Sequence, residues 1–313
     1  MSTGDDGATA RRWYRHGWNR PLSWELILRI TPWLPRFVLV PLHHLTTLLC
    51  LACMPTERAA ARRNLHRVTG TTGLAAAWLC YRLFFNFGRF LVAYGELRRL
   101  KPEELRERLL DLEHTDTALR QLLAEGRGVV LATLHIGQWD IGLKLLSGFG
   151  VPVHVVMLSE DPREITRYAD EARAWTQLRV HQMGASPLLA LELMAALRRG
   201  EIVAVQIDRA VGANVMPMTL FGATTELPTG AAHLAMATGA PVLPTFVLLD
   251  RGTRYRLLSL PPLRFERNER ESALHDAMSG LVQAMEHVIS RYPDQWFNFY
   301  DVWPQDSGEG APR

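Results

Sequence analysis

The residues with the clearest chemical potential are His135 and Asp140, just after the apolar run VVLATL at 129–134. A neutral imidazole accepts a hydroxyl proton, and a carboxylate beside it fixes its tautomer and stabilises the imidazolium that forms. Residues five apart on an ideal helix point about 140° away from each other. A turn at Ile136–Gly137 is therefore needed to bring the two side chains together. The pair predicts general-base catalysis on a hydroxyl group, with no nucleophilic Ser or Cys.

A second polar pair, Asp208 and Arg209, follows another apolar run, IVAVQI at 202–207. Asp208 is expected to point into the same cleft as His135. Arg209 is expected to bind a phosphate or an oxyanion, because a guanidinium group matches planar anions with two parallel hydrogen bonds. The alternative is an ion pair at the strand end that involves these two residues and their neighbours.

Further along, Gly222, Thr229 and Gly230 lie in a stretch rich in turn-forming residues. Thr229 is a plausible N-cap of a helix, whose exposed amides could also bind an anion. These residues are expected to shape the substrate site rather than to react. On the helical side, Arg89 is a further candidate for the cleft, although an exposed surface arginine is the more common case.

The elements that position these residues are read from the pattern of apolar residues. Residues 56–125 have a helical pattern, whereas short apolar runs alternate with amphipathic segments after Gly128. Strands separated by helices predict an α/β fold with a central, mostly parallel sheet flanked by helices. Helices are expected near 139–148, 163–176, 187–199, 229–238 and 271–291. In such sheets ligands bind at the carboxyl ends of the strands, where His135 and Asp208 are expected.

The N-terminal segment is basic and apolar at once. Residues 37–54 are almost long enough to span a bilayer, where about 20 apolar residues are needed, but Pro41 and the adjacent histidines weaken the span. Between residues 11 and 67 the sequence carries ten arginines and only two acidic residues, together with several tryptophans. This mixture suits the headgroup layer of a membrane, which we expect as a partner. The alternative is a helical cap whose aromatic residues pack on the core.

Several other classes of function are disfavoured. Cys50, Cys53 and Cys80 form no disulfide framework, and no histidine spacing typical of a zinc site occurs. Nucleotide-binding glycine loops and the G-x-S-x-G elbow of hydrolases are missing, and no nucleic-acid reading module is present. The first twenty residues do not resemble a signal peptide. We therefore expect no metal, no cofactor and no nucleic acid, in a reducing cytoplasmic setting.

The chain resembles the lysophospholipid acyltransferase superfamily, specifically its late lipid A biosynthesis (lauroyl/myristoyl) acyltransferase branch. The segment LHIGQWD at 134–140 is similar to the family's H-F-G-N-W-E segment. The stretches VQIDRAVG at 205–212 and VMPMTLFG at 215–222 resemble its D-x-D/R-x-x-G and V-x-V-P-F-F-G elements. The segments LPTG at 227–230, TGAPVLPTF at 238–246 and RYPDQWFNF at 291–299 resemble its downstream and closing motifs. Together these motifs cover about residues 56–303.

The resemblance implies an acyltransferase in which His135 and Asp140 form the catalytic dyad. It implies acyl-carrier protein or acyl-CoA as the donor, and a hydroxyl group of a membrane lipid of lipid A or glycolipid biosynthesis as the acceptor. The expected location is the cytoplasmic face of the inner membrane. Two substitutions depart from the pattern: Gln138 replaces the usual Asn and Asp140 the usual Glu. Asp208–Arg209 resembles the branch that acylates mannosylated phosphatidylinositol as much as the lipid A branch.

The alternatives are therefore a different acceptor, such as a phosphatidylinositol mannoside or a pigment-like molecule, a lipid thioesterase or hydrolase, and a lipid-binding protein without activity. The expected organisation has three parts. Residues 1–55 form a membrane-anchoring segment, residues 56–303 form the acyltransferase domain, and residues 304–313 form a loose tail. Within the domain, a helical cap at 56–125 precedes the α/β core at 126–303.

Overall fold

The computed structural model describes residues 35–97, 100–157, 178–183, 186, 188–210, 214–266 and 271–304. The chain divides into two compact units. Unit 1 consists of the residues up to Arg99 and those from Phe297 onward, whereas unit 2 runs from Leu100 to Trp296. Most of the predicted anchoring segment at 1–55 and the predicted tail lie outside the described residues. The functional boundaries drawn from the sequence stay predictions.

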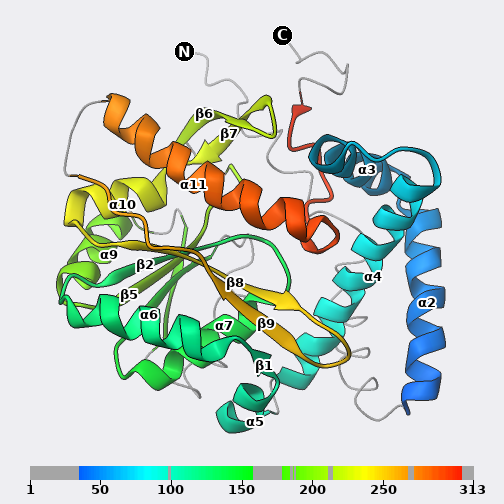
Figure 1. Cartoon of the computed structure of the whole chain (residues 1–313), viewed down its shortest axis with the longest axis horizontal. Coiled ribbons are helices and arrows are strands. Elements are labelled where there is room, and N and C mark those ends of the chain that lie inside the picture. The colour runs from blue at the N-terminus through cyan, green and yellow to red at the C-terminus, as the bar shows by residue number, and fades with distance from the viewer. Residues whose placement is uncertain are drawn as a thin grey trace. The chain divides into compact units, whose positions relative to one another are not determined.

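The described residues of unit 1 form three helices, α2 (Arg36–Cys53), α3 (Pro55–Thr69) and α4 (Gly73–Leu97), coloured blue to cyan in Figure 1. Its C-terminal residues are tied to α3 by Asn64, which is 3% exposed. The Asn64 side-chain amide donates to the carbonyls of Asn298 and Tyr300, at 3.1 and 2.7 Å. The rings of Phe84 and Phe87 on α4 meet Phe299 edge-on. Residues from the two ends of the chain thus form one unit.

No single helix in the described ranges has the length and apolar character to cross a bilayer; α2 and α3, bent by 96° at their junction, pass that test only as a pair. Along α2, however, large apolar side chains are exposed in unit 1. Leu45, Leu48 and Leu49 are 54%, 56% and 51% exposed. On α4, Trp78 is 61% exposed. Helix α2 therefore presents an apolar surface, as the sequence pattern of residues 37–54 predicted.

Unit 2 is built on a seven-stranded sheet in the order β1-β9-β8-β2-β5-β3-β4. All neighbouring pairs are parallel except β8 and β9. The strands are β1 (Leu109–Leu110), β2 (Val129–Thr133), β3 (Val153–Met157), β4 (Leu178–Gln182), β5 (Ile202–Gln206), β8 (Val242–Leu249) and β9 (Tyr255–Ser259). A separate hairpin pairs β6 (Val215–Leu220) with β7 (Ala223–Pro228). The mostly parallel α/β sheet predicted from the sequence is confirmed.

The helices of unit 2 flank this sheet (Figure 1). Those in the described ranges are α5 (Pro102–Glu107), α6 (Leu112–Ala124), α7 (Trp139–Leu146), α9 (Leu189–Arg198), α10 (Gly230–Thr238) and α11 (Glu271–Arg291), with short 3-10 turns at Ser147–Phe149 (η2) and Pro293–Gln295 (η3). The predicted helices near 139–148, 187–199, 229–238 and 271–291 are thereby confirmed, and that near 163–176 lies outside the described residues. The two-residue strand β1 and the β6–β7 hairpin were not predicted.

One face of the sheet packs on α6 and the end of α7. Alternate residues of β2 and β5 point to this face, as the two-residue period of a strand requires. They form a buried cluster with Leu119 and Leu122 of α6 and Leu146 of α7. Burying a leucine side chain stabilises a fold by about 1.5–3 kcal/mol. This packing fixes α7, and with it the residues at its N-terminus, against the sheet.

Candidate active site

The register of two neighbouring strands places His135 beside Asp208. In the parallel pair of β2 and β5, Thr133 stands opposite Gln206. His135 and Asp208 each lie two residues beyond that last matched pair. They therefore emerge side by side at the carboxyl edge of the sheet, the edge at which α/β proteins bind ligands.

Asp208 holds His135 at two points. Its carboxylate lies 2.8 Å from the imidazole Nδ1 and accepts the backbone N–H of His135 at 3.1–3.2 Å. Asp208 is 2% exposed, whereas the His135 side chain remains 16% exposed. The carboxylate is therefore a buried anchor, and the imidazole retains access from outside.

A third donor reaches the same carboxylate from the C-terminal end of unit 2. The indole Nε1 of Trp296 donates to Asp208 at 2.9 Å. The backbone of Trp296 forms an isolated antiparallel bridge with Ile136, next to His135. The side-chain amide of Gln295 pairs with both backbone groups of Leu249, accepting its N–H at 2.7 Å and donating to its carbonyl at 3.0 Å. The segment is thus fixed to the end of β8 and to the turn after β2.

The turn at Ile136–Gly137 that the sequence demanded requires a glycine. Gly137 has φ +59°, and a Cβ on it would lie 2.1 Å from the carbonyl oxygen of Val247. The amide of Gln138 donates to that same carbonyl at 2.7 Å, and helix α7 begins at the next residue. A close backbone approach and a left-handed conformation coincide here, and both favour glycine.

The electrostatics of the pair favour a neutral base beside a charged carboxylate. Burial, reinforced by the charge of Arg209, lowers the pKa of His135, and the attraction of Asp208 opposes this shift without overcoming it. Burial by itself raises the pKa of Asp208, but His135, Arg209 and the Trp296 indole together bring that pKa well below its ordinary value. At neutral pH the imidazole is therefore unprotonated, as a general base must be.

Asp140, the predicted partner of His135, lies half-buried in the first turn of α7. The imidazole of His135 hydrogen bonds to the carboxylate of Asp208. An orienting role for Asp140 stays a prediction. Trp139, which precedes Asp140 in the sequence, meets the imidazole of His135 edge-on, with ring centroids 5.5 Å apart.

The other predicted site residues lie in different places. Arg209 follows Asp208 directly and is half-buried, close enough for its charge to act on both members of the pair. Gly222 is exposed at the turn between β6 and β7, with φ +75°. Thr229 occupies the N-cap position of α10 before Gly230, but its hydroxyl donates to the carbonyl of Asn214 at 3.2 Å instead of capping the helix. The binding roles of these residues stay predictions.

Arg89 belongs to α4 of unit 1 and donates to the side chain of Asn86 at 3.4 Å. Its predicted place in the substrate cleft stays a prediction.

Two glutamines, the buried Gln138 and the half-buried Gln206, lie near the pair in sequence. Gln138 is completely buried, and within the described residues neither polar atom of its side chain has a hydrogen-bond partner. The same holds for Nε2 of Gln206, at the end of β5. An unsatisfied buried polar group costs about 1–3 kcal/mol, and such groups in a folded protein call for a functional or structural reason. Gln138 follows His135 by three residues, and Gln206 precedes Asp208 by two. Side chains with unused polar atoms at these positions suit a site that binds a ligand with a polar group.

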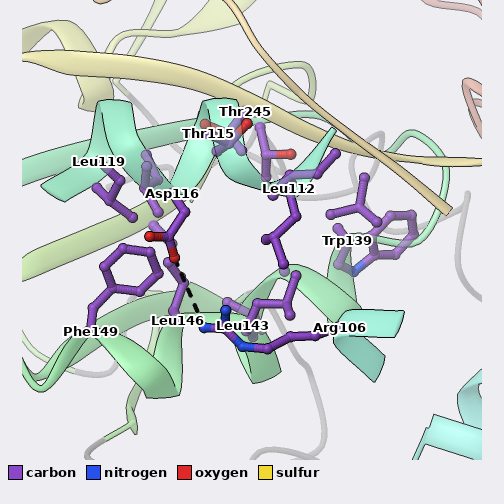
Figure 2. A pocket seen from close by; sticks show the side chains of 17 residues that line it. Arg106, Leu112, Thr115, Asp116, Leu119, Trp139, Leu143, Leu146, Phe149 and Thr245 are labelled. Carbon is purple, nitrogen blue, oxygen red and sulfur yellow. Dashed lines mark ion pairs between the residues drawn. The ribbon is translucent and has the colours of Figure 1, made fainter. Parts of the chain in front are cut away.

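An apolar pocket of about 660 Å³, including the solvent at its mouth, opens in unit 2 next to this site (Figure 2). At one end lies Trp139, whose ring meets that of His135, and at the other lie Leu119 and Phe149 (Figure 2). The remaining lining is also rich in carbon and comes from the sheet and α7: Leu131, Val247, Leu257 and Leu146. Arg106 and Asp116 approach each other across it at 3.9 Å. From Trp139 to Leu146 the eight residues of α7 extend over about 12 Å. The pocket thus suits a long, apolar ligand that ends near the imidazole.

Comparison with known proteins gives the family. A model of the bacterial lipid A biosynthesis acyltransferases matches residues 24–305. The chain belongs to that family. It is also 27% identical over 266 residues to the phosphatidylinositol mannoside acyltransferase of Mycobacterium tuberculosis (strain H37Rv), with 79% of this chain and 78% of the relative covered. The protein of the same name from Mycolicibacterium smegmatis is 26% identical over 250 residues, with 78% and 79% covered.

Membership of this family makes the chain an acyltransferase, as its motifs indicated. The resemblance drawn from residues 134–140, 205–222 and 291–299 is thereby confirmed. The residue that the sequence reading missed is Trp296, which stood within a matching motif but had no assigned role. A signal was present: an indole is a donor that needs a partner when buried, and Asp208 was the buried acceptor still to be satisfied.

Proposed function

We propose that this protein transfers a fatty acyl chain from acyl-carrier protein or acyl-CoA to a hydroxyl group of a membrane glycolipid, with His135 as general base and Asp208 as the carboxylate that orients it. The observation that carries the proposal is the 2.8 Å contact between His135 Nδ1 and the buried Asp208. With Nδ1 engaged, Nε2 is the nitrogen that accepts a proton.

The reaction follows from this arrangement. As the acceptor oxygen forms its bond to the thioester carbonyl carbon, its proton passes to Nε2 of His135. The imidazolium is stabilised by Asp208, as in triads where a carboxylate supports a histidine. The carbon–sulfur bond then breaks, the sulfur leaves with the electron pair, and the imidazolium returns the proton to it. An acyl ester and a free thiol result, and no covalent acyl-enzyme is needed.

The apolar pocket is the natural site for the acyl chain in this proposal. It is lined by carbon and begins at Trp139, which touches the base. A chain that fills it removes apolar surface from water, which stabilises the complex by about 25 cal/mol per Å². The thioester carbonyl would then lie at the carboxyl edge of the sheet, near His135.

For the acceptor, a phosphorylated glycolipid fits best, because Arg209 places a guanidinium group beside the base. Lipid A precursors and phosphatidylinositol mannosides are the two leading candidates. The first is favoured by the family and the second by the names of the relatives. The proposed location is the cytoplasmic face of the inner membrane, with the exposed apolar side chains of α2 in the lipid layer.

Lipid mass spectrometry tests the reaction and identifies the acceptor. Cells that express the protein should contain a lipid heavier by one acyl chain than the corresponding lipid in cells without it. The His135→Ala variant is the control, because removal of a general base costs about 10²- to 10⁴-fold in rate and this side chain adds little to the core. Equal lipid profiles in the presence of abundant, folded protein would refute the proposal, and so would full activity of His135→Ala.

A pair of opposite substitutions tests the acyl pocket. Ala204, on β5, and Phe149, in η2, both line the pocket. Ala204→Leu should shift the transferred chains toward shorter lengths, and Phe149→Ala should shift them toward longer ones. Both variants disturb packing, by about 1–3 kcal/mol for the larger side chain and about 3–5 for the smaller. Loss of stability alone would therefore not move chain length in two directions; an unchanged distribution in both variants would place the acyl chain elsewhere.

A further inference from the structure

The chain of hydrogen bonds at the site continues beyond Asp208, to a residue outside the proposed chemistry. Asp208 accepts the imidazole of His135 through Oδ1 at 2.8 Å and the indole of Trp296 through Oδ2 at 2.9 Å. Trp296 is only 2% exposed, so its indole N–H needs a hydrogen-bond acceptor within the protein. We infer that Trp296 is a positioning residue, which holds the Asp208 carboxylate in the orientation that presents it to His135.

The way in which Trp296 is held supports this role. Its backbone bridges to Ile136, the residue after His135. The preceding residue, Gln295, accepts the N–H of Gly137 through its carbonyl at 3.0 Å and binds both backbone groups of Leu249 through its amide. The segment that delivers the indole is therefore fixed to the same turn that carries the imidazole. The Trp296 indole, the Asp208 carboxylate and the His135 imidazole are therefore fixed relative to one another.

The imidazole bonds to Oδ1 and the indole to Oδ2, while the backbone N–H of His135 lies within reach of both oxygens. Without the indole, the carboxylate would keep its bonds to His135 but lose one restraint on rotation about its terminal bond, a torsion that is broad by itself. With the indole on Oδ2, rotation breaks a further hydrogen bond to a charged group, the stronger kind of hydrogen bond. The indole hence supplies orientation, and the imidazole needs that orientation to keep Nε2 aimed outward.

This inference rests on the pairing of His135 with Asp208 and can be tested without any substrate. The groups that act on His135 by charge are Asp208 and Arg209, with Asp140 on the adjoining first turn of α7. Without the indole donor, the Asp208 carboxylate becomes more basic, since Trp296 contributes to its lowered pKa. A more basic carboxylate holds the imidazolium proton more tightly. The pKa of His135 should therefore rise.

The experiment follows the titration of His135 by NMR in full-length protein labelled with ¹³C at histidine Cε1, in the wild type and in Trp296→Phe. Trp303→Phe is the matched control, because Trp303 is also buried, at 4% exposed, but stacks against Arg67 in unit 1. We expect an upward shift in the pKa of His135 in Trp296→Phe and none in Trp303→Phe. An unchanged His135 titration in Trp296→Phe, or equal shifts in both variants, would overturn the inference.

A second substitution covers the case in which Trp296→Phe does not fold. Site-specific replacement of Trp296 by β-(3-benzothienyl)alanine keeps the shape of the ring and exchanges the N–H for sulfur. The same upward shift is expected, together with a loss of acyl transfer of about 10- to 100-fold, the range seen when outer partners of a metal-site ligand are removed. If the shift appears in a protein that transfers no acyl chain even as wild type, the positioning role holds and the proposed function fails. Full activity with an unmoved titration overturns the role of Trp296 alone.

Discussion

Two carboxylates compete for one role beside His135. Asp208 is placed against the imidazole by strand register, whereas Asp140 lies in the first turn of α7, five residues after His135 in the sequence. A carboxylate at Nδ1 fixes the tautomer that leaves Nε2 unprotonated. Substitution of each carboxylate in turn distinguishes Asp208 from Asp140, because only loss of the orienting carboxylate should disturb the tautomer of His135.

Asp208→Asn should lower turnover by about 10³- to 10⁴-fold, since a neutral amide at Nδ1 allows the wrong tautomer and leaves the imidazolium unsupported. Asp140→Asn is the matched comparison. If Asp208 is the orienting group, Asp140→Asn should act mainly on the Michaelis constant of the acceptor. Steady-state rates over a range of acceptor concentrations decide the matter, and the reverse ranking of the two turnover numbers would return the role to Asp140.

The positions of His135 and Asp208 could be predicted from the sequence, but their contact could not. His135 and Asp208 each follow a six-residue apolar run, so their position at strand ends was readable. Their contact was not, because it depends on β2 and β5 being neighbours although β3 and β4 lie between them in the chain. Strand order is set by packing over the whole sheet rather than by local pattern. The turn at Gly137, in contrast, was predicted, as a means of bringing His135 and Asp140 together.

At the scale of elements, strands with continuous apolar runs were predictable because a central parallel strand is buried on both faces. The β6–β7 hairpin was not, since Pro217 interrupts its apolar pattern and its outward residues are polar. Strand β1 has only two residues and no local signal. The sequence thus predicted the elements that the core dictates and missed those that tertiary pairing alone sustains.

A chain of polar groups, with His154 and Glu201 buried, lies across β3, β4 and the residues just before β5. His154 hydrogen bonds to His181 at 2.8 Å and to Glu201 at 2.7 Å, and Arg199 forms two bonds to Glu201. Burial lowers the pKa of His154, and it lowers that of His181 with help from the charge of His154. This cluster lies outside the proposed chemistry but affects how the fold responds to acid.

The free energy of unfolding should fall as the pH drops below about 6.5, the ordinary pKa of histidine. Because the folded-state pKa values are depressed, the unfolded chain binds more protons in this window; stability is complete above it and is lost as the pH falls toward the folded values. Denaturant titrations at pH 7.5 and 5.5 measure the loss. Replacing the buried His154 by Gln should reduce the pH dependence, whereas replacing the exposed His275 by Gln should leave it unchanged. Equal pH dependence in all three proteins would show that the cluster does not titrate.

For the whole molecule, the exposed leucines of α2 are the feature that most needs an explanation. A cluster of large exposed apolar side chains on one element typically marks an interaction surface. We propose a bilayer as that partner, because it would accommodate both these side chains and the basic N-terminal sequence.

Replacing Leu45, Leu48 and Leu49 by Gln should release much of the protein from membranes, since each side chain would lose its favourable transfer into the lipid layer. Leu188→Gln with Leu191→Gln is the control, because these leucines of unit 2 are 56% and 58% exposed as well. Flotation with phospholipid vesicles measures the bound fraction. Retention of the α2 variant at the level of the control would place the membrane contact elsewhere.

The two-part composition of unit 1 has a consequence for the order of synthesis. Helices α3 and α4 leave the ribosome early, but the backbone groups that satisfy Asn64, and the rings that meet Phe84 and Phe87, belong to residues from Phe297 onward. All of unit 2 is translated in between. Helices α3 and α4 can therefore complete their packing only after the residues from Phe297 onward have been synthesised. During that interval the apolar surface of α4 that packs on the last residues stays uncovered.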